Sequence, residues 1–163
     1  MSAMARWYVI NTRPKKEFQV EKLFTEGGFT YYNPVYKQER RVRPFFPGYG
    51  FLTFDFPAQY QMVKYTRGVK RVVGNKEGPI PIPDEVVQEI RAREIGGLIE
   101  LEKHGAAPQV GDEIEVAEGP LKGLRGVFQR EIDDKERVMI LLSYVSYQGQ
   151  LLIEKGKLKK ATS

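Results

Sequence analysis

Residues 110–127 read Val-Gly-Asp-Glu-Ile-Glu-Val-Ala-Glu-Gly-Pro-Leu-Lys-Gly-Leu-Arg-Gly-Val. Within this stretch Ile114 and Val116 alternate with glutamates, which is the two-residue period of a strand with one buried face. A Gly-Pro pair then forces a turn, and a second strand is predicted to begin near Leu124. Glycines stand where the corners of a small barrel need a positive φ or a close approach of two backbones. These glycines are Gly119, Gly123 and Gly126. The stretch therefore predicts a small, tightly curled β-barrel.

The same stretch resembles the KOW motif, a short barrel module of transcription and ribosome-associated proteins. The matching pairs are Gly111-Asp112, Gly119-Pro120 and Gly126-Val127. Any other SH3-like barrel is the alternative. Further strands are expected at Val138–Val145 and in the tail Gly156–Ser163.

The composition is that of an intracellular binding protein. Of the 163 residues 41% are hydrophobic, which is enough for one medium core or two small ones. The chain has no cysteine, which excludes disulfides and thiol catalysis. Its lone histidine, His104, lies in an expected linker, so zinc sites built from His and Cys are also excluded. No signal-type or membrane-spanning apolar run occurs. We expect a cytoplasmic monomer without a metal or cofactor.

Charge is divided unevenly along the chain. The formal net charge of +5 lies in residues 1–105, which carry 17 Lys and Arg against 12 Asp and Glu, while residues 106–163 carry nine of each. A basic half beside a neutral half suggests that the first contacts phosphate and the second contacts protein, although ordinary solvated surfaces can have this charge too.

Residues 1–97 are predicted to form an α+β domain. Apolar runs rich in aromatic and β-branched residues predict strands at Trp7–Asn11, Phe29–Tyr36, Gly48–Phe54 and Val69–Val73. Helices are predicted after Pro14, near Ala58–Tyr65 and after Pro83, the last one ending at Gly96-Gly97. Four strands with helices on one side form a split βαβ, RRM-like, antiparallel-sheet sandwich. Residues 98–108 are the expected linker, and residues 109–163 the expected SH3-like β-barrel domain.

Two of these strands fit most of the RNA-recognition-motif signature. Gly48–Phe54 matches the signature of the third strand, and Trp7–Asn11 resembles its companion on the first. Tyr49 and Phe51 would then be platforms on which RNA bases stack. However, Pro47 stands where the signature requires Lys or Arg. An apolar patch beside a basic face is also typical of a protein-docking site, which is the interpretation we favour.

A second resemblance extends along nearly the whole chain. In the order and spacing of its motifs the chain resembles the NusG family. The motifs are, in chain order, Trp7-Tyr8-Val9 before a helix with a basic start, Phe46–Phe51, Thr66–Val69, and the KOW stretch after a linker. The residues around Thr66–Val69 and Val138–Val145 look more like the specialised RfaH-type paralogues than like housekeeping NusG.

The resemblance implies a non-enzymatic transcription elongation and antitermination factor. Its N-terminal (NGN) domain would bind RNA polymerase and suppress pausing. The polymerase-facing patch maps onto Phe46, Tyr49, Phe51 and Phe54, and aromatic side chains suit such a patch because they bury a large area with few rotatable bonds. Alternate strand residues Tyr49 and Phe51 point the same way, so Phe54 is a candidate for the core instead.

The RfaH-type resemblance also implies contact with the non-template single-stranded DNA of the elongation complex. The residues at the matching positions are Arg13, Lys15, Lys16, Thr66 and Arg67. A basic surface with few base contacts suits the capture of a single strand. For the two lysines, simple exposure to solvent at the start of a helix is an equally good explanation. A second basic cluster consists of Arg40, Arg41 and Arg43. For these residues, contact with DNA and simple exposure to solvent are equally good explanations.

For the KOW region the resemblance implies a protein partner, either a small-subunit ribosomal protein or a termination factor, with Tyr144 and Val145 at the contact. Some RfaH-type paralogues fold this region as a helical hairpin that hides the polymerase patch. A helical form would enclose Gly123, Gly126 and Gly149, each costing about 1 kcal/mol relative to Ala. The apolar run Val138–Leu142 could pack in either form. We expect the barrel.

Enzymatic functions lack the necessary residues. There is no Cys, no usable His, no glycine loop with Lys-Ser or Lys-Thr for phosphate, and no carboxylate pair at predicted strand ends. The two remaining hypotheses are a transcription elongation factor and an RRM-type RNA-binding protein with an appended barrel.

Overall fold

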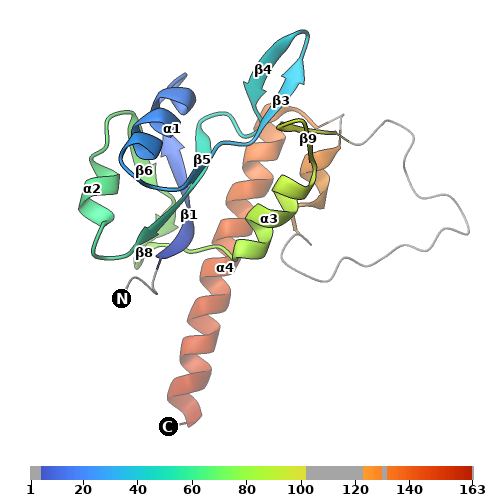
Figure 1. Cartoon of the computed structure of the whole chain (residues 1–163). Coiled ribbons are helices and arrows are strands. Elements are labelled where there is room, and N and C mark those ends of the chain that lie inside the picture. The colour runs from blue at the N-terminus through green and yellow to red at the C-terminus, as the bar shows by residue number, and fades with distance from the viewer. Residues whose placement is uncertain (1–4, 102–122, 130–131, 163) are drawn as a thin grey trace, which may run out of the picture.

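The computed structural model describes residues 5–101, 123–129 and 132–162. The elements in chain order are β1 (Ala5–Thr12), α1 (Glu17–Glu26), β2 (Tyr31–Tyr32), β3 (Val35–Gln38), β4 (Arg41–Pro44), β5 (Tyr49–Asp55), α2 (Tyr60–Lys64), β6 (Val69–Val72), β7 (Gly74–Asn75), β8 (Gly78–Pro79), α3 (Asp84–Ala92), β9 (Glu94–Ile95), β10 (Leu98–Ile99), η1 (Arg125–Phe128) and α4 (Asp134–Thr162). Figure 1 shows their arrangement.

The centre of the fold is a four-stranded sheet in the order β2-β5-β1-β6, with every neighbouring pair antiparallel. Strands β1 and β5 pair along most of their length, with Val9 opposite Phe51 and Tyr8 opposite Leu52. This arrangement confirms the predicted α+β, split βαβ domain, with the two longest strands of the described residues, β1 and β5, at its centre.

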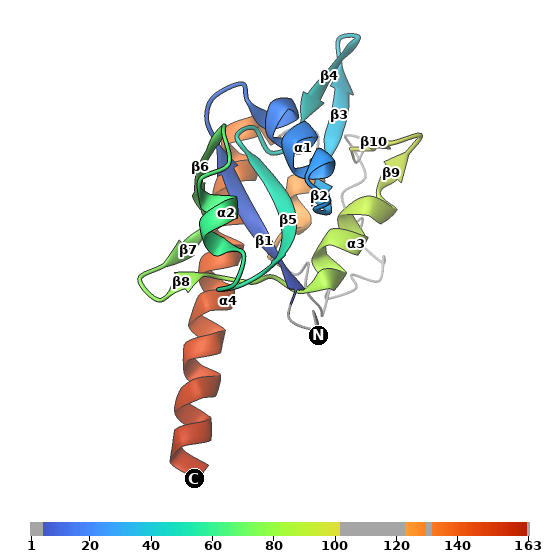
Figure 2. The same cartoon turned by 60° about the vertical axis from the view of Figure 1, so that its left-hand side comes forward.

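Alternation along the strands divides the core into two clusters. Tyr8 and Ile10 face the cluster that α1 and α2 cover, together with Val20 and Phe24 of α1. Trp7 and Val9 face the opposite cluster, which includes residues of α3, η1 and α4. The prediction of helices on one side of the sheet is therefore wrong, because α3 and α4 cover the second face (Figure 2).

Three short hairpins extend from the domain: β3–β4, β7–β8 and β9–β10. The turn of β3–β4 has positive φ at Glu39 and Arg40, as tight hairpin turns require. Gly96 and Gly97 also have positive φ and join β9 to β10, so they form a hairpin turn rather than the end of α3. The first residues of the expected linker, Leu98–Ile99, accordingly pair with β9.

The described part of residues 109–163 is helical, so the barrel strands predicted there are wrong. The short helix η1 stands where the second barrel strand was expected to begin. Helix α4 includes both Val138–Val145 and Gly156–Thr162. The strand predicted around Ile114 lies outside the described residues. Figures 1 and 2 show α4 running along the sheet domain, with its C-terminal turns extending away from it.

The period of the buried positions explains the helix. Within α4 the residues Arg137, Leu141, Tyr144, Val145 and Gly149 are buried. Their spacing of three or four residues places them on one helical face. A strand would instead bury every second residue and would not bury two adjacent ones on the same face.

The glycines do not prevent the helix, because only one of them lies inside α4. Gly123 lies in a turn and Gly126 lies in η1, so Gly149 is the one of the three that α4 encloses. The cost is then about 1 kcal/mol instead of about three times that amount. A Cβ atom at Gly149 would lie 2.6 Å from Cδ1 of Ile80. A methyl group at this position would therefore require the end of the Ile80 side chain to shift.

Candidate functional site

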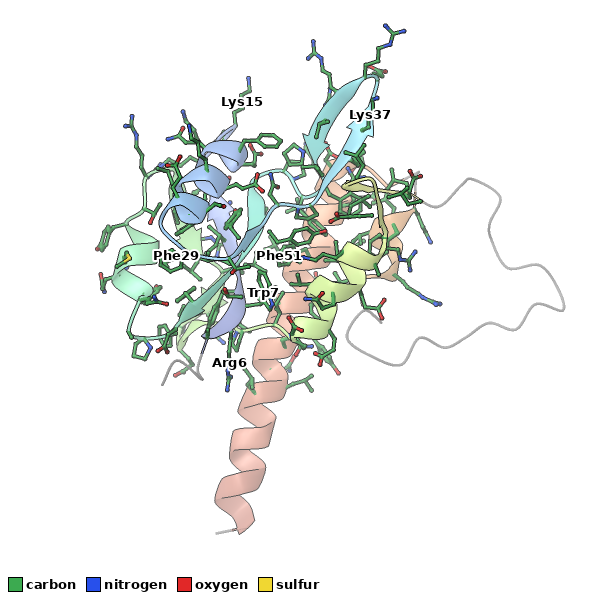
Figure 3. The ribbon with its side chains drawn as sticks, viewed as in Figure 1. Arg6, Trp7, Lys15, Phe29, Lys37 and Phe51 are labelled. Carbon is green, nitrogen blue, oxygen red and sulfur yellow. The ribbon has the colours of Figure 1, made fainter. Side chains whose placement is uncertain are left out.

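Three of the four predicted polymerase-binding residues share one face of the sheet, here called the aromatic face: Phe46, Tyr49 and Phe51 with Trp7. Phe46 and Phe51 are 0% exposed, and Tyr49 is half-buried against the same cluster. The rings of Phe46 and Phe51 meet edge-on with centroids 6.0 Å apart. Figure 3 shows Trp7 and Phe51 on the side of the sheet that carries α3. The structure therefore brings these residues together but covers them.

Phe54 lies on the other face. It is buried with Leu52 in the cluster under α1 and α2, and its ring centroid is 4.4 Å from that of Tyr8. Strand alternation had made Phe54 a candidate for the core, and the structure places it there. Phe54 is thus separated from the aromatic face by the sheet itself.

The cover of the aromatic face comes from η1 and α4 as well as α3. The C-terminal residues in this cluster are Leu124, Val127, Phe128, Leu141, Tyr144 and Val145. The ring of Phe128 stacks on that of Phe45 with centroids 5.9 Å apart. The guanidinium carbon of Arg93 lies 4.3 Å from the centroid of the Phe128 ring. The C-terminal segment therefore packs on the sheet domain as part of one continuous core.

Arg137 fastens the first turns of α4 to the segment Tyr36–Phe45. The residue is only 3% exposed. Its Nε donates to the Phe45 carbonyl at 3.0 Å, its Nη1 donates to the Ile132 carbonyl at 2.8 Å, and its Nη2 donates to the Tyr36 hydroxyl at 3.2 Å. The same Nη2 pairs with Asp134, to which the Tyr36 hydroxyl also donates. These bonds satisfy a buried charge and define the position of α4.

Tyr144 and Val145, the predicted partner-binding residues, lie on α4 and are buried. The Tyr144 hydroxyl has no hydrogen-bond partner among the described residues. Burial, and then the nearby charge of Glu85, raises the pKa of Tyr144 to about 12. Neither residue is available to a partner while α4 is packed.

The predicted nucleic-acid-binding residues Arg13, Thr66 and Arg67 meet in one surface groove of about 360 Å³, here called the basic groove. Its lining residues are Arg13, Lys64, Tyr65, Thr66, Arg67, Gly68, Val69 and Lys70. The Arg13 amide donates to the Gly68 carbonyl at 2.8 Å, which joins the two walls. Gly68 has a φ of +93°, and a Cβ there would lie 2.8 Å from Cγ2 of Val20. Glycine is required at this position.

The side chain of Thr66 stabilises the backbone that forms the groove. Its hydroxyl donates to the Met62 carbonyl at 2.8 Å and so bonds an otherwise unpaired carbonyl in the last turn of α2. The positive charges of the groove are those of arginine and lysine side chains, all of them exposed. The arrangement can attract a phosphate chain along its length.

Lys15 and Lys16 are exposed in the turn before α1 and do not line the basic groove. Behind them, the carboxylate of Glu17 accepts a hydrogen bond from the Gly48 amide at 2.9 Å. The side-chain amide of Asn11 donates to the Gly48 carbonyl at 2.9 Å. The start of α1 and the turn that leads into β5 are therefore held together.

Arg40, Arg41 and Arg43 lie on the β3–β4 hairpin and are exposed. They are not part of the basic groove. Figure 3 shows Lys37 of this hairpin and Lys15 projecting from the same end of the molecule. The hairpin arginines thus form a separate positive surface.

Sequence reasoning missed two features of these sites. Tyr65 lies in the basic groove between Lys64 and Thr66, and an aromatic residue inside a basic stretch was the available signal. Arg137 was missed because a buried arginine at the start of a helical stripe resembles an ordinary surface charge when α4 is interpreted as a strand.

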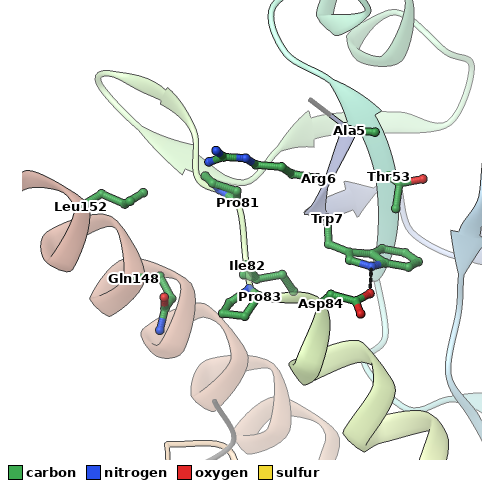
Figure 4. Close-up of a pocket in the computed structure, with 10 residues that line it drawn as sticks. All are labelled: Ala5, Arg6, Trp7, Thr53, Pro81, Ile82, Pro83, Asp84, Gln148 and Leu152. Carbon is green, nitrogen blue, oxygen red and sulfur yellow. Dashed lines mark hydrogen bonds between the residues drawn. The ribbon is translucent and has the colours of Figure 1, made fainter. Parts of the chain in front are cut away.

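A second groove, of about 530 Å³, opens where α4 passes the beginning of β1. Figure 4 shows it between Trp7, the segment Pro81–Asp84, and Gln148 and Leu152 of α4. The Trp7 indole donates to Asp84 at 2.8 Å on its wall. The packing of α4 against the domain is therefore incomplete at this point.

Among the described residues no group of His, Cys, Asp and Glu side chains could hold a metal ion. Within residues 5–101, 123–129 and 132–162, no helix is both long and apolar enough to cross a bilayer.

The sheet order and helix positions define an RRM-like α+β domain whose aromatic face carries a C-terminal helix. Residues 5–91 match the family described as "Transcription termination factor nusG". Since this match spans more than half of the chain, the protein belongs to the NusG family. It is therefore a transcription factor of a family that is non-enzymatic and binds RNA polymerase.

The chain is also similar to a solved structure described as "Domain interaction in Thermotoga maritima NusG". The similarity covers 75% of this chain and 77% of that chain, with 22% sequence identity and a TM-score of 0.46. No curated protein matches the chain.

Proposed function

We propose that this protein is an elongation and antitermination factor of the RfaH type, which binds RNA polymerase through the aromatic face and suppresses pausing. The observation that carries the proposal is the concentration of Phe46, Tyr49 and Phe51 on one sheet face under a separate C-terminal helix. Large aromatic side chains of this kind are typical anchors of a protein interface.

In this proposal α4 and the aromatic face form a closed state. RNA polymerase and α4 compete for the same side chains, so binding requires that α4 leave. A ligand can shift such an equilibrium only by its preference for one state, and RNA polymerase has that preference because it binds the open state alone. The parts that would separate in this proposal are the sheet domain, which includes β10, and the segment that carries η1 and α4.

The basic groove is the proposed site for non-template single-stranded DNA. Arg13 and Arg67 supply the phosphate contacts, Thr66 shapes the groove, and Lys15 and Lys16 extend the positive surface at the start of α1. The hairpin residues Arg40, Arg41 and Arg43 are a second candidate surface. Affinity should fall steeply as salt rises, because each neutralised phosphate releases counterions.

Departure of α4 would also expose Tyr144 and Val145. We propose that the released C-terminal segment then recruits the protein partner, a small-subunit ribosomal protein or a termination factor. The alternative, an RRM-type RNA-binding protein, is less favoured because Pro47 stands where the RRM signature requires Lys or Arg.

The test uses the full chain with Leu141→Glu, which places a carboxylate at a buried contact of α4, and the matched control Met139→Glu, at a position that is 66% exposed on the same helix. Core RNA polymerase should bind Leu141→Glu at least tenfold more tightly than the wild type and the control. Adding Tyr49→Ala and Phe51→Ala should abolish this binding while circular dichroism still shows a folded domain. Equal affinity for all the variants would contradict the proposal, and unfolding would assign Tyr49 and Phe51 to the core alone.

The DNA contact has its own test. Arg67→Ala should reduce the slope of the logarithm of affinity against the logarithm of salt concentration for a single-stranded oligonucleotide. An unchanged slope would place Arg67 on the solvated surface and would leave the hairpin arginines as the candidates.

A further inference from the structure

Tyr65 is the most exposed of the large apolar or aromatic side chains described, with 74% of its surface open to solvent. It follows directly after α2 and lines the basic groove. A tyrosine ring left outside the core gives up the stabilisation that burial would supply. Its position therefore points to a ligand rather than to the stability of the domain.

The backbone on both sides of Tyr65 is held in place. The Tyr65 amide donates to the Gln61 carbonyl at 3.1 Å, and the Thr66 amide donates to the Val63 carbonyl at 3.2 Å. The Thr66 hydroxyl adds its bond to Met62. The ring is thus presented from a rigid turn, which lowers the entropy lost when it binds a flat partner.

Cations lie around this ring. Lys64 places its Nζ 5.7 Å from the Tyr65 ring centroid and 5.6 Å from that of Tyr60. The other cationic residues of the same groove are Arg13, Arg67 and Lys70. An exposed aromatic ring among cations is the combination that binds a single nucleic-acid strand, in which phosphates contact the charges and an unpaired base stacks on the ring.

We propose that Tyr65 is a base-stacking residue for single-stranded DNA in the basic groove. The inference rests on the proposed function of that groove and adds to it a contact with a base. In a duplex each base is already stacked between its neighbours and paired, so its face is not available to Tyr65. The residue accordingly makes the groove selective for a single strand without making it selective for sequence, because every base has a π-face.

The experiment measures fluorescence anisotropy of a labelled twelve-nucleotide thymidine strand, an abasic strand of the same length and a duplex, each titrated with the full chain at several salt concentrations. Tyr65→Ala should weaken binding to the thymidine strand about tenfold, which is at the lower end of the effect of removing one stacked aromatic side chain. It should leave binding to the abasic strand and the salt slope unchanged, because no phosphate contact is lost. Tyr65→Phe should restore wild-type affinity, and Tyr147→Ala, an exposed tyrosine on α4, should have no effect.

The outcomes separate the two proposals. If the wild-type chain binds none of the three ligands in a salt-dependent way, the basic groove is not a DNA site and both proposals are wrong. If binding is salt-dependent but Tyr65→Ala leaves the affinity for the thymidine strand unchanged, the basic groove is still supported as a DNA site, but the stacking role of Tyr65 is overturned. An equal loss on the thymidine and abasic strands would also overturn stacking, since it would show a contact with the backbone.

Discussion

The two faces of the sheet are covered in different ways. Under α1 and α2 the cluster is formed by residues 8–72, which are close together in the sequence, and its members are apolar or aromatic. Over the aromatic face the cover comes in part from η1 (Arg125–Phe128) and α4 (Asp134–Thr162), which are remote in the sequence from β5 (Tyr49–Asp55). The first face is thus covered by elements that are near in the sequence, whereas the second is covered in part by a remote segment.

The second face also buries polar groups and has an open groove, although unpaired polar atoms are buried at Thr12 and Asn33 too. It includes the buried charge of Arg137, the unpaired hydroxyl of Tyr144 and the open groove beside Gln148. A buried ion pair adds little net stability but specifies position, and an unpaired buried hydroxyl costs free energy. The comparison indicates that α4 is positioned accurately without being held at the greatest attainable strength, which suits a segment that must leave.

The largest expected effect tests this difference directly. Phe24→Ala, under α1, removes a ring whose centroid is 5.5 Å from those of Phe29 and Tyr31, and should cost about 3–5 kcal/mol of the unfolding free energy of the whole domain. Leu141→Ala should cost about 2–5 kcal/mol of the docking free energy of α4 alone. Hydrogen exchange should then show fast amides in α4 and protected amides in β1 and β5. If both variants lower one cooperative transition equally, the two faces do not differ.

The sequence predicted the first face well and the second poorly, and the reason is physical. Strand alternation placed Tyr49 and Phe51 on one face and made Phe54 a candidate for the core, because a period of two leaves little choice once one face is buried. The basic groove was predicted in part, but through the RfaH-type resemblance, which selects Arg13, Thr66 and Arg67, and not through a local pattern.

The C-terminal segment was mispredicted because its local pattern is compatible with two structures. The run Val138–Leu142 is continuously apolar, which a buried strand and a buried helix share. The contacts that decide for the helix are remote, namely Arg137 with Phe45 and Gly149 with Ile80. No local propensity reports such contacts, so tertiary packing determined the outcome.

A smaller effect is expected at Gly149, where propensity and packing oppose each other. Gly149→Ala should stabilise an isolated helix by about 1 kcal/mol. In the full chain the new methyl group would meet Ile80, so docking should weaken by about 1–3 kcal/mol instead. Binding to core RNA polymerase should therefore become tighter, although the helix propensity has risen. Tighter docking in this variant would show that the Ile80 side chain moves aside at little cost. The glycine would then not determine how closely α4 packs against the domain.

The smallest effect is expected at Tyr144. Replacing it with phenylalanine removes a buried hydroxyl without a partner, so docking of α4 should strengthen by about 1 kcal/mol and binding to RNA polymerase should weaken a few-fold. Tyr147→Phe, at a side chain that is 56% exposed, is the matched control and should change neither. Weaker docking of Tyr144→Phe would mean that the hydroxyl makes a bond that stabilises the closed state.

The pH dependence of the same variant sharpens this test. The pKa of Tyr144 is about 12 when α4 is docked, against about 10 for an ordinary tyrosine. Below pH 10 the phenol is neutral in both states and its contribution to docking is complete. As the pH rises from about 10 to about 12 the undocked form ionises first, so the wild type loses docking free energy over this range. Tyr144→Phe has no phenol to ionise, and hydrogen exchange of α4 in the two proteins should therefore diverge with rising pH. Parallel profiles would place the Tyr144 hydroxyl in contact with solvent and would show that it does not weaken the docking of α4.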